Sequence, residues 1–325
     1  MRKGIALALA LLMLFMLSGC AGKQEPAGAN TSVVVGFSQL GAESSWRIAN
    51  TASMEQAAKE AGYSLMMENA NQKQEKQIDA IRSFIAYRVD VIVFSPIVET
   101  GWDNVLTEAK QAGIPVILMD RMIETQDDSL YASYVGADFY AEGRRAGEYL
   151  VRTADALTAE HLNIVEICGT KDSTPMRDRQ KGFMDAISDD PRFTVIDSVD
   201  GDFLRSKGEE CAEQLLERYG TEGIDVIYSH NDSMMLGVLD VLERKGIQPG
   251  KDILLITVDG EKEAVDALKA GKINCVVQCT PNLGPVAMKL IQSLTTGEAI
   301  SIVTHPEESL FTDFDDLTDP SVEGF

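Results

Sequence analysis

Short apolar runs alternate with segments of helical periodicity along most of the chain. The first run covers residues 32–37 (SVVVGF). The helical segment after it, residues 46–61, has serines at its start and Gly62 at its end, which are typical helix boundaries. The next helical segment places three isoleucines on one face: Ile78, Ile81 and Ile85. Strands that alternate with helices predict a parallel sheet with helices on both faces.

The same alternation begins again after residue 130. Residues 131–136 (YASYVG) read as a strand, and residues 141–152 read as the helix that follows it. Five further apolar runs are each followed by a helical segment: 162–168, 193–199, 225–230, 252–260 and 273–279. Two such series predict an α/β protein of two similar lobes, each a doubly wound parallel sheet. Because no low-complexity run separates the series, we expect short connections between the lobes.

The first twenty residues do not belong to this pattern. Arg2 and Lys3 precede an apolar run, residues 5–17, which is too short to span a bilayer comfortably. The run ends in LSGC, which resembles a bacterial lipobox whose cysteine, Cys20, becomes the lipidated first residue. An ordinary secretory signal or an uncleaved anchor is the alternative. We therefore expect a signal peptide at 1–20, a flexible tether at 21–32, and a protein anchored by lipid to the extracellular or periplasmic side of the cell membrane.

Charge and motifs narrow the classes of function. The net charge of −22 disfavours nucleic acid, whose affinity for proteins depends on lysine and arginine at the phosphates. GxGxxG after a strand, GxxxxGK[ST], GxSxG and HExxH are all absent, and no carboxylates form a distinctive catalytic pair. We therefore expect a protein that is not an enzyme, with no catalytic residues, no cofactor and no metal site.

The cysteines and histidines carry no clear chemistry in the sequence. Cys275 and Cys279 lie four residues apart on an expected strand, roughly 13 Å by strand rise, so they cannot bridge each other. A bridge between Cys168 and Cys211 is possible, with free core thiols as the alternative. The three histidines are scattered and read as ordinary surface or loop residues: His161, His230 and His305.

Polar side chains follow several of the expected strands. One strand ends in Asp120 and Arg121, a second in His230 and Asn231, and a third in Asp259. Ligands of open α/β sheets bind beyond the carboxyl ends of the strands, so these side chains are expected to face one cleft. Carboxylates accept and arginine and asparagine donate hydrogen bonds in geometries that suit a polyol. A helix N-cap is the ordinary role for any one of these residues taken alone.

Residues 33–325 resemble the type 1 sugar-binding proteins of ABC importers, the ribose and galactose binders. Motifs that carry the resemblance occur in the family's order, among them FSQLGAESSWR, TGWDNVLTEAKQAGIPVILMDR, GDFLRSKG, HNDSMMLG and TPNLGP. Within the family, the galactofuranose binders are the most similar. The resemblance implies the periplasmic binding protein type 1 fold, with two lobes joined by hinge strands. It implies a first lobe of residues 33–137 plus 281–304, and a second of residues 138–280 plus 305–325.

The resemblance also assigns sugar-binding residues. Trp46 and Phe203 match positions where aromatic rings lie against the sugar, and the polar positions are matched by Ser44, Arg47, Asp120, Arg121, Arg179, Asn231 and Asp259. Where ribose binders carry a hinge-strand glutamine, this chain has Cys279, with Gln278 one place earlier as the remaining candidate. Because neighbours on a strand face opposite ways, the role of Gln278 stays open. Arg177 is expected to be solvated, and Trp102 to be structural.

The resemblance implies that the protein captures a galactofuranose-like monosaccharide between two closing lobes. It also implies that the protein is a monomer that delivers the sugar to the permease and ATPase subunits of an ABC importer. One alternative is a binding protein that reports to a membrane sensor kinase or chemoreceptor. Another is a binder of ribose, galactose or arabinose. A repressor-type sensory domain shares the fold, but it would need a DNA-binding helix where the lipobox lies.

Overall fold

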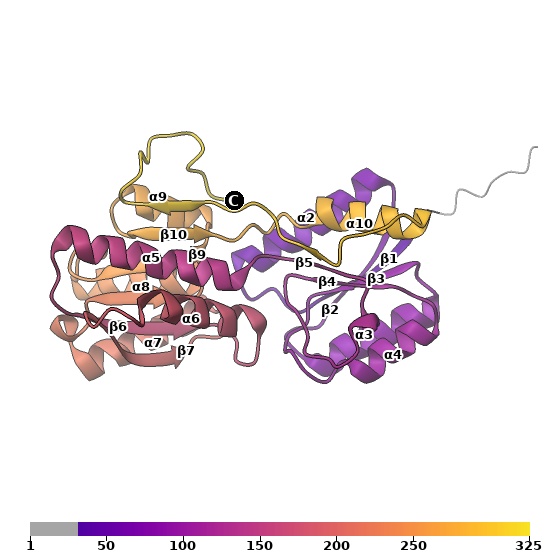
Figure 1. Cartoon of the computed structure of the whole chain (residues 1–325), viewed down its shortest axis with the longest axis horizontal. Helices are drawn as coiled ribbons and strands as arrows, with labels where there is room; N and C mark the ends of the chain where they lie inside the picture. The colour runs from indigo at the N-terminus through magenta and orange to yellow at the C-terminus, as the bar shows by residue number, and fades with distance from the viewer. Residues whose placement is uncertain (1–31) are drawn as a thin grey trace, which may run out of the picture. The chain divides into compact units, whose positions relative to one another are not determined.

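The structure is a computed structural model that describes residues 32–325 (Figure 1). The expected signal peptide, Cys20 and nearly all of the tether lie outside the described residues. Within residues 32–325, no helix has the length and apolar character needed to cross a membrane. The described chain forms two six-stranded sheets, and we call the part built on each sheet a lobe.

The first lobe contains a fully parallel sheet in the order β11-β5-β4-β3-β1-β2. Its strands are β1 (Val34–Gln39), β2 (Ser64–Asn69), β3 (Val91–Phe94), β4 (Val116–Met119), β5 (Ser133–Val135) and β11 (Val303–Thr304). Its helices are α2 (Ser45–Ala61), α3 (Gln74–Tyr87), α4 (Asp103–Gln111) and α10 (Gly284–Thr296), with a 3₁₀ turn at Asp128–Leu130. Helices α2 and α10 pack on one face of the sheet, and α3 and α4 on the other.

The second lobe repeats this arrangement in the order β12-β10-β9-β8-β6-β7, and only β12 is antiparallel to its neighbour. Its strands are β6 (Leu162–Cys168), β7 (Phe193–Asp200), β8 (Val226–Ser229), β9 (Leu254–Asp259), β10 (Cys275–Gln278) and β12 (Leu310–Thr312). Its helices are α5 (Phe139–Leu157), α6 (Thr174–Ile187), α7 (Arg205–Tyr219), α8 (Asp232–Lys245) and α9 (Lys262–Lys269), with a 3₁₀ turn at Thr221–Gly223. Helices α5 and α6 cover one face, and α7, α8 and α9 the other.

The expected fold class is confirmed, because both sheets are doubly wound and their strands follow the same spatial order. Each strand lies in the sheet to which the expected lobe ranges assign it, although the boundaries themselves stay a prediction. The chain passes between the sheets three times: from β5 to α5, from β10 to α10, and from β11 to β12 (Figure 1). These three crossings are the hinge connections.

Local sequence explains where the helices beside the strand ends begin. The Ser44 hydroxyl accepts a hydrogen bond from the backbone N–H of Arg47 at 3.2 Å and so caps α2. Asn231 caps α8 in the same way, through Met234 N–H at 3.0 Å. Both caps lie where a strand of the sheet gives way to a helix, so they bring polar side chains to the carboxyl edge of each sheet.

All four cysteines of the described chain are free thiols and buried. The Cys168 sulfur lies 3.2 Å from the Ser198 hydroxyl, and the Cys211 sulfur 3.6 Å from the Asp200 carbonyl oxygen. Cys168 and Cys211 are therefore not bridged, and the alternative prediction of free core thiols is confirmed.

Candidate functional site

A small cavity lies at the carboxyl ends of both sets of strands. Thirteen residues line it: Glu43, Ser44, Trp46, Arg47, Asp120, Arg121, Phe139, Pro175, Arg179, Phe203, Asn231, Asp259 and Cys279. Nine of the ten expected sugar-binding residues are in this set, so the structure brings together residues from both lobes at one place.

Two arginines flank one carboxylate on the first-lobe side of the cavity. The Arg47 Nη2 donates to Asp120 Oδ2 at 2.6 Å, and Arg121 Nε lies 3.7 Å from the same oxygen. Arg47 is also held by Glu43 at 3.1 Å, and Arg121 by the Ile97 carbonyl oxygen at 3.1 Å. All these charged side chains are buried, so the first lobe presents a preorganised set of donors and acceptors.

Arg179 organises the second-lobe side. Its Nε donates to Glu142 at 2.7 Å, its Nη1 to the backbone carbonyl oxygen of His230 at 2.5 Å, and its Nη2 lies 3.5 Å from Asp259. Asn231 adds an amide whose Nδ2 donates to the Phe203 carbonyl oxygen at 3.3 Å. The planar guanidinium is thereby fixed in one orientation beside Asp259.

Three aromatic rings also line the cavity, and each has an arginine beside it. The guanidinium carbon of Arg47 lies 4.6 Å from the Trp46 ring centroid, and those of Arg121 and Arg179 lie 5.4 Å from Phe203 and 5.2 Å from Phe139. The Trp46 indole N–H donates to the Cys279 carbonyl oxygen at 2.7 Å, which ties α2 to the segment after β10.

Some polar atoms at the cavity have hydrogen-bonding capacity left over. Among the described residues, Arg47 Nη1, Arg121 Nε and Glu43 Oε2 are buried and make no hydrogen bond. An unmatched buried polar group costs about 1–3 kcal/mol, so native proteins rarely keep several in one place without a reason. A ligand that both donates and accepts hydrogen bonds would satisfy these atoms.

The backbone is strained at the same place. Asp120 and Phe203 have φ values of 65° and 63°, and Asp259 has 131°, in regions that side-chain-bearing residues seldom adopt. Such conformations cost of order 1–3 kcal/mol each and gather at binding sites, where the surrounding structure holds them. All three of these residues line the cavity.

Burial and neighbouring charges shift the pKa values of the ionisable groups that line the cavity. Burial alone would lower the pKa of Arg47, but its ion pairs with Asp120 and Glu43 raise it above the ordinary value. Burial and repulsion by Arg47 lower the pKa of Arg121 to about 10. Burial raises the pKa of Asp259 well above its usual range, although Arg179 favours the charged form. The cavity is therefore suited to an uncharged polar ligand, which adds no further charge to a desolvated site.

Gln278 does not line the cavity. Its side-chain oxygen accepts a hydrogen bond from Ser309 N–H at 3.0 Å, and Cys279 faces the cavity in its place. Successive residues of an extended segment point to opposite sides, so Gln278 faces away from the cavity when Cys279 faces it. We therefore leave Gln278 out of the proposed binding residues.

Trp102 and Arg177 also lie away from the cavity. Trp102 is fully buried against Phe94, with the two ring centroids 5.0 Å apart, and is structural as expected. The Arg177 side chain is 53% exposed, and it pairs with Glu99 and Asp178.

Sequence reasoning missed four residues that line the cavity. Cys279 had been noted only as a departure from the family pattern. Glu43 adjoins the expected Ser44. Phe139 and Pro175 lie in the first turns of α5 and α6, where an apolar residue gives no sign that it faces a ligand.

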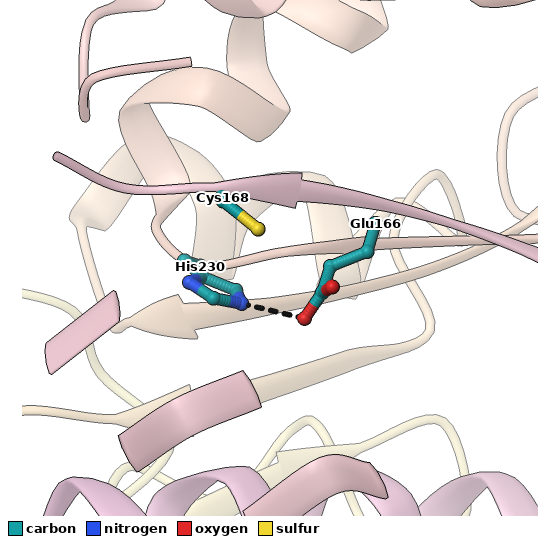
Figure 2. Close-up of side chains that lie close together, drawn as sticks. All are labelled: Glu166, Cys168 and His230. Carbon is teal, nitrogen blue, oxygen red and sulfur yellow. Dashed lines mark hydrogen bonds and ion pairs between the residues drawn. The ribbon is translucent and has the colours of Figure 1, made fainter. Parts of the chain in front are cut away.

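His230 lies in the loop between β8 and α8, but the expectation that it is an ordinary surface residue is wrong. Its side chain is fully buried, and its Nε2 lies 2.9 Å from a Glu166 carboxylate oxygen. Figure 2 shows this hydrogen bond with Cys168 beside it. Gly169 N–H lies 3.4 Å from His230 Nδ1, which makes Nδ1 the acceptor and Nε2 the donor to Glu166. Gln180 and Ser198 donate hydrogen bonds to the other Glu166 oxygen, so the four side chains form one hydrogen-bond network. The network includes His230, whose backbone carbonyl oxygen accepts from Arg179.

Comparisons with known proteins agree with this geometry. Residues 35–299 match the model of the periplasmic binding protein domain. The chain belongs to the periplasmic binding protein family. It is 41% identical to the galactofuranose-binding protein YtfQ of Escherichia coli over 80% of this chain and 81% of that protein. Members of this family bind solutes and are not enzymes.

Two solved structures of periplasmic binding proteins are similar over most of the chain. One is a Mycobacterium smegmatis protein in complex with β-D-fucofuranose, with a TM-score of 0.84 and 45% identity over 87% of this chain and 92% of that one. The other is the binding component of the arabinose ABC transporter of Shewanella sp. ANA-3, bound to α- and β-L-arabinofuranose. Its TM-score is 0.82, with 39% identity over 86% of this chain and 91% of that one.

Proposed function

We propose that this protein captures a monosaccharide in its furanose form, galactofuranose or a close relative, and delivers it to an ABC importer. The observation that carries the proposal is the small cavity in which two arginine–carboxylate groups, one from each lobe, face one another among three aromatic rings. The relatives at 39–45% identity support the furanose form, since one is a galactofuranose-binding protein and the other two are bound to a fucofuranose and to arabinofuranose.

The chemistry of the cavity matches a sugar. Asp120 and Asp259 each offer oxygens that accept from hydroxyl groups, and the free Arg47 Nη1 and Arg121 Nε can donate to ring or hydroxyl oxygens. The rings of Trp46, Phe139 and Phe203 supply apolar faces for the C–H groups of the sugar. Because the two sides belong to different lobes, a sugar bound to both stabilises the closed arrangement, the form that an importer would recognise.

The ring form can be tested directly. When D-galactose labelled with ¹³C at C1 is bound by the protein, its C1 resonance should move to the furanose range and not the pyranose range. Calorimetry with D-galactose, D-fucose and L-arabinose should then give weak apparent affinities, because only the furanose fraction of each free sugar competes for the site.

Methyl furanosides and methyl pyranosides of galactose provide the matched control, since neither can change its ring size. If bound labelled galactose gives a pyranose resonance, the furanose proposal is wrong, even if the protein binds sugar. If none of these sugars raises the melting temperature at millimolar concentration, the sugar proposal itself is wrong.

We also propose that the protein is anchored to the cell membrane through lipid at Cys20 and acts as a monomer. The support is the LSGC sequence after a short apolar run. Replacing Cys20 with alanine should release the protein from the membrane fraction or block its processing, because the acyl chains that would hold it at the membrane are attached at this residue. Mass spectrometry of the mature N-terminus should find an acylated Cys20, and an unmodified residue other than Cys20 at that end would contradict the proposal.

A further inference from the structure

Side chains from different chain crossings meet beside the cavity. Glu142 lies in the first turn of α5, after the first crossing; Cys279 begins the second crossing; and Glu308 lies in the third. Carboxylate oxygens of the two glutamates and the Cys279 sulfur lie within 4.8 Å of one another. Glu142 is fully buried and Glu308 half-buried, so two acidic groups share a poorly solvated place at the hinge.

The hydrogen bonds of the two glutamates are complementary. Glu142 Oε2 accepts from Arg179 Nε at 2.7 Å, but Glu142 Oε1 is buried and makes no hydrogen bond within the described chain. Glu308 Oε1 accepts from Thr280 N–H at 3.0 Å, which leaves its second oxygen free to carry a proton. Glu142 therefore lacks a hydrogen-bond donor at Oε1, and a protonated Glu308 can supply that donor.

Two carboxylates this close in a buried place do not both ionise. Arg179 donates directly to Glu142, so Glu308 is the one expected to carry the proton. The ionisable and charged groups that face Glu308 from the surrounding elements are Tyr134 on β5, Glu142 and Arg145 on α5, Arg179 on α6, and Cys279 after β10. A metal cation here would lie close to two guanidinium groups, whereas a proton removes the repulsion without adding an ion.

We propose that Glu308 is a positioning residue for the sugar site: its protonated carboxyl group donates to Glu142 Oε1, and Glu142 in turn holds Arg179. The inference rests on the proposed function for its binding readout. Burial and the charge of Glu142 raise the pKa of Glu308 to about 9, which keeps this carboxyl neutral at physiological pH. The donor is therefore present below pH 9 and is lost as the pH rises through that value.

The expected result is an alkaline loss of affinity that depends on Glu308. If only the protonated form holds Arg179 correctly, a pKa of about 9 makes the sugar dissociation constant roughly fourfold larger at pH 9.5 than at pH 7.5. Arg121 also titrates in this range, since its pKa is about 10. The informative quantity is therefore the difference between the wild type and Glu308→Gln, whose amide donates a hydrogen bond at every pH.

Calorimetry with the tightest-binding furanoside at pH 7.5 and 9.5 should give a Glu308→Gln variant that binds like the wild type at pH 7.5 and lacks the fourfold loss. The neighbouring Glu307 is exposed, so Glu307→Gln is the matched control and should follow the wild type. Glu308→Ala, which removes the donor, should bind less tightly than Glu308→Gln at pH 7.5. A purely structural Glu308 would instead change the melting temperature and leave the pH profile of binding unchanged.

A second measurement needs no sugar. In protein labelled with ¹³C at the glutamate side-chain carboxyl, one resonance that is absent from Glu308→Gln should titrate near pH 9. If that resonance titrates near 4.5, or if the wild type and Glu308→Gln lose affinity equally at pH 9.5, the inference is overturned. Failure of the wild type to bind any furanoside at pH 7.5 would instead count against the proposed function and leave the carboxyl titration as the deciding test.

Discussion

Replacing Asp120 with asparagine is expected to weaken binding of the preferred sugar by roughly 30- to 1,000-fold, with the fold retained. The carboxylate is buried, bonds Arg47 at 2.6 Å and lies 3.7 Å from Arg121. Without its charge, both guanidiniums lose an ion-pair partner and the sugar loses a carboxylate. Loss of a charged partner in such a site costs on the order of 2–4 kcal/mol, which corresponds to that range of affinity.

Asparagine is the informative replacement because Asp120 has a φ of 65°. Asparagine tolerates this left-handed conformation, whereas alanine would add backbone strain to the loss of charge. Isothermal calorimetry measures the affinity, and a thermal melt of the same sample checks the fold. Asp128, which is exposed on a surface turn, provides the control Asp128→Asn with unchanged affinity. Near-wild-type binding by Asp120→Asn would show that the sugar does not use this carboxylate.

Replacing Arg179 with alanine is expected to lower both stability and sugar affinity. Glu142, fully buried, would lose its bond from Arg179, and the His230 carbonyl oxygen would lose its donor. Breaking a buried ion pair by removing one partner costs about 3–5 kcal/mol of unfolding free energy. Binding should weaken by at least about 30-fold, as for Asp120, because the guanidinium also orients Asp259.

Arg177 offers a matched control two residues earlier on the same helix. Its side chain is half exposed, but its partner Glu99 is buried, so Arg177→Ala tests the loss of a partly buried ion pair at a position that does not line the cavity and should leave sugar affinity close to that of the wild type. Urea unfolding and calorimetry on both variants make the comparison. Equal effects of the two substitutions on sugar affinity would argue against Arg179 as a binding residue.

Much of the fold and most of the cavity could be predicted from the sequence because both depend on local patterns. Buried parallel strands such as β3 and β8 are continuous apolar runs, and polar residues directly after a strand, such as Asp120 and Asn231, fall at the sheet edge where ligands bind. The resemblance to known sugar binders then selected which of these residues face the cavity.

The rest depended on contacts between distant segments. The sequence does not show which of Gln278 and Cys279 faces the cavity. The direction in which the chain leaves β10 places Cys279 at the cavity and turns Gln278 toward Ser309. His230 was read as an ordinary surface or loop residue because nothing beside it in the sequence shows that Glu166, 64 residues away, accepts its N–H. Glu308 carried no signal because its partner Glu142 belongs to another crossing of the hinge.

The three chain crossings also determine the order in which the molecule can fold as it is synthesised. Helix α10 packs against α2, and Gly284 lies so close to Ser53 that an added Cβ would come within 2.2 Å of the Ser53 carbonyl oxygen. Strand β11 forms the edge of the sheet beside β5. A nascent chain that ends before residue 284 therefore leaves uncovered the side of α2 that α10 packs against, even though most of the first lobe's residues have already been made. The lobe that begins first is thus completed only when nearly the whole polypeptide is available.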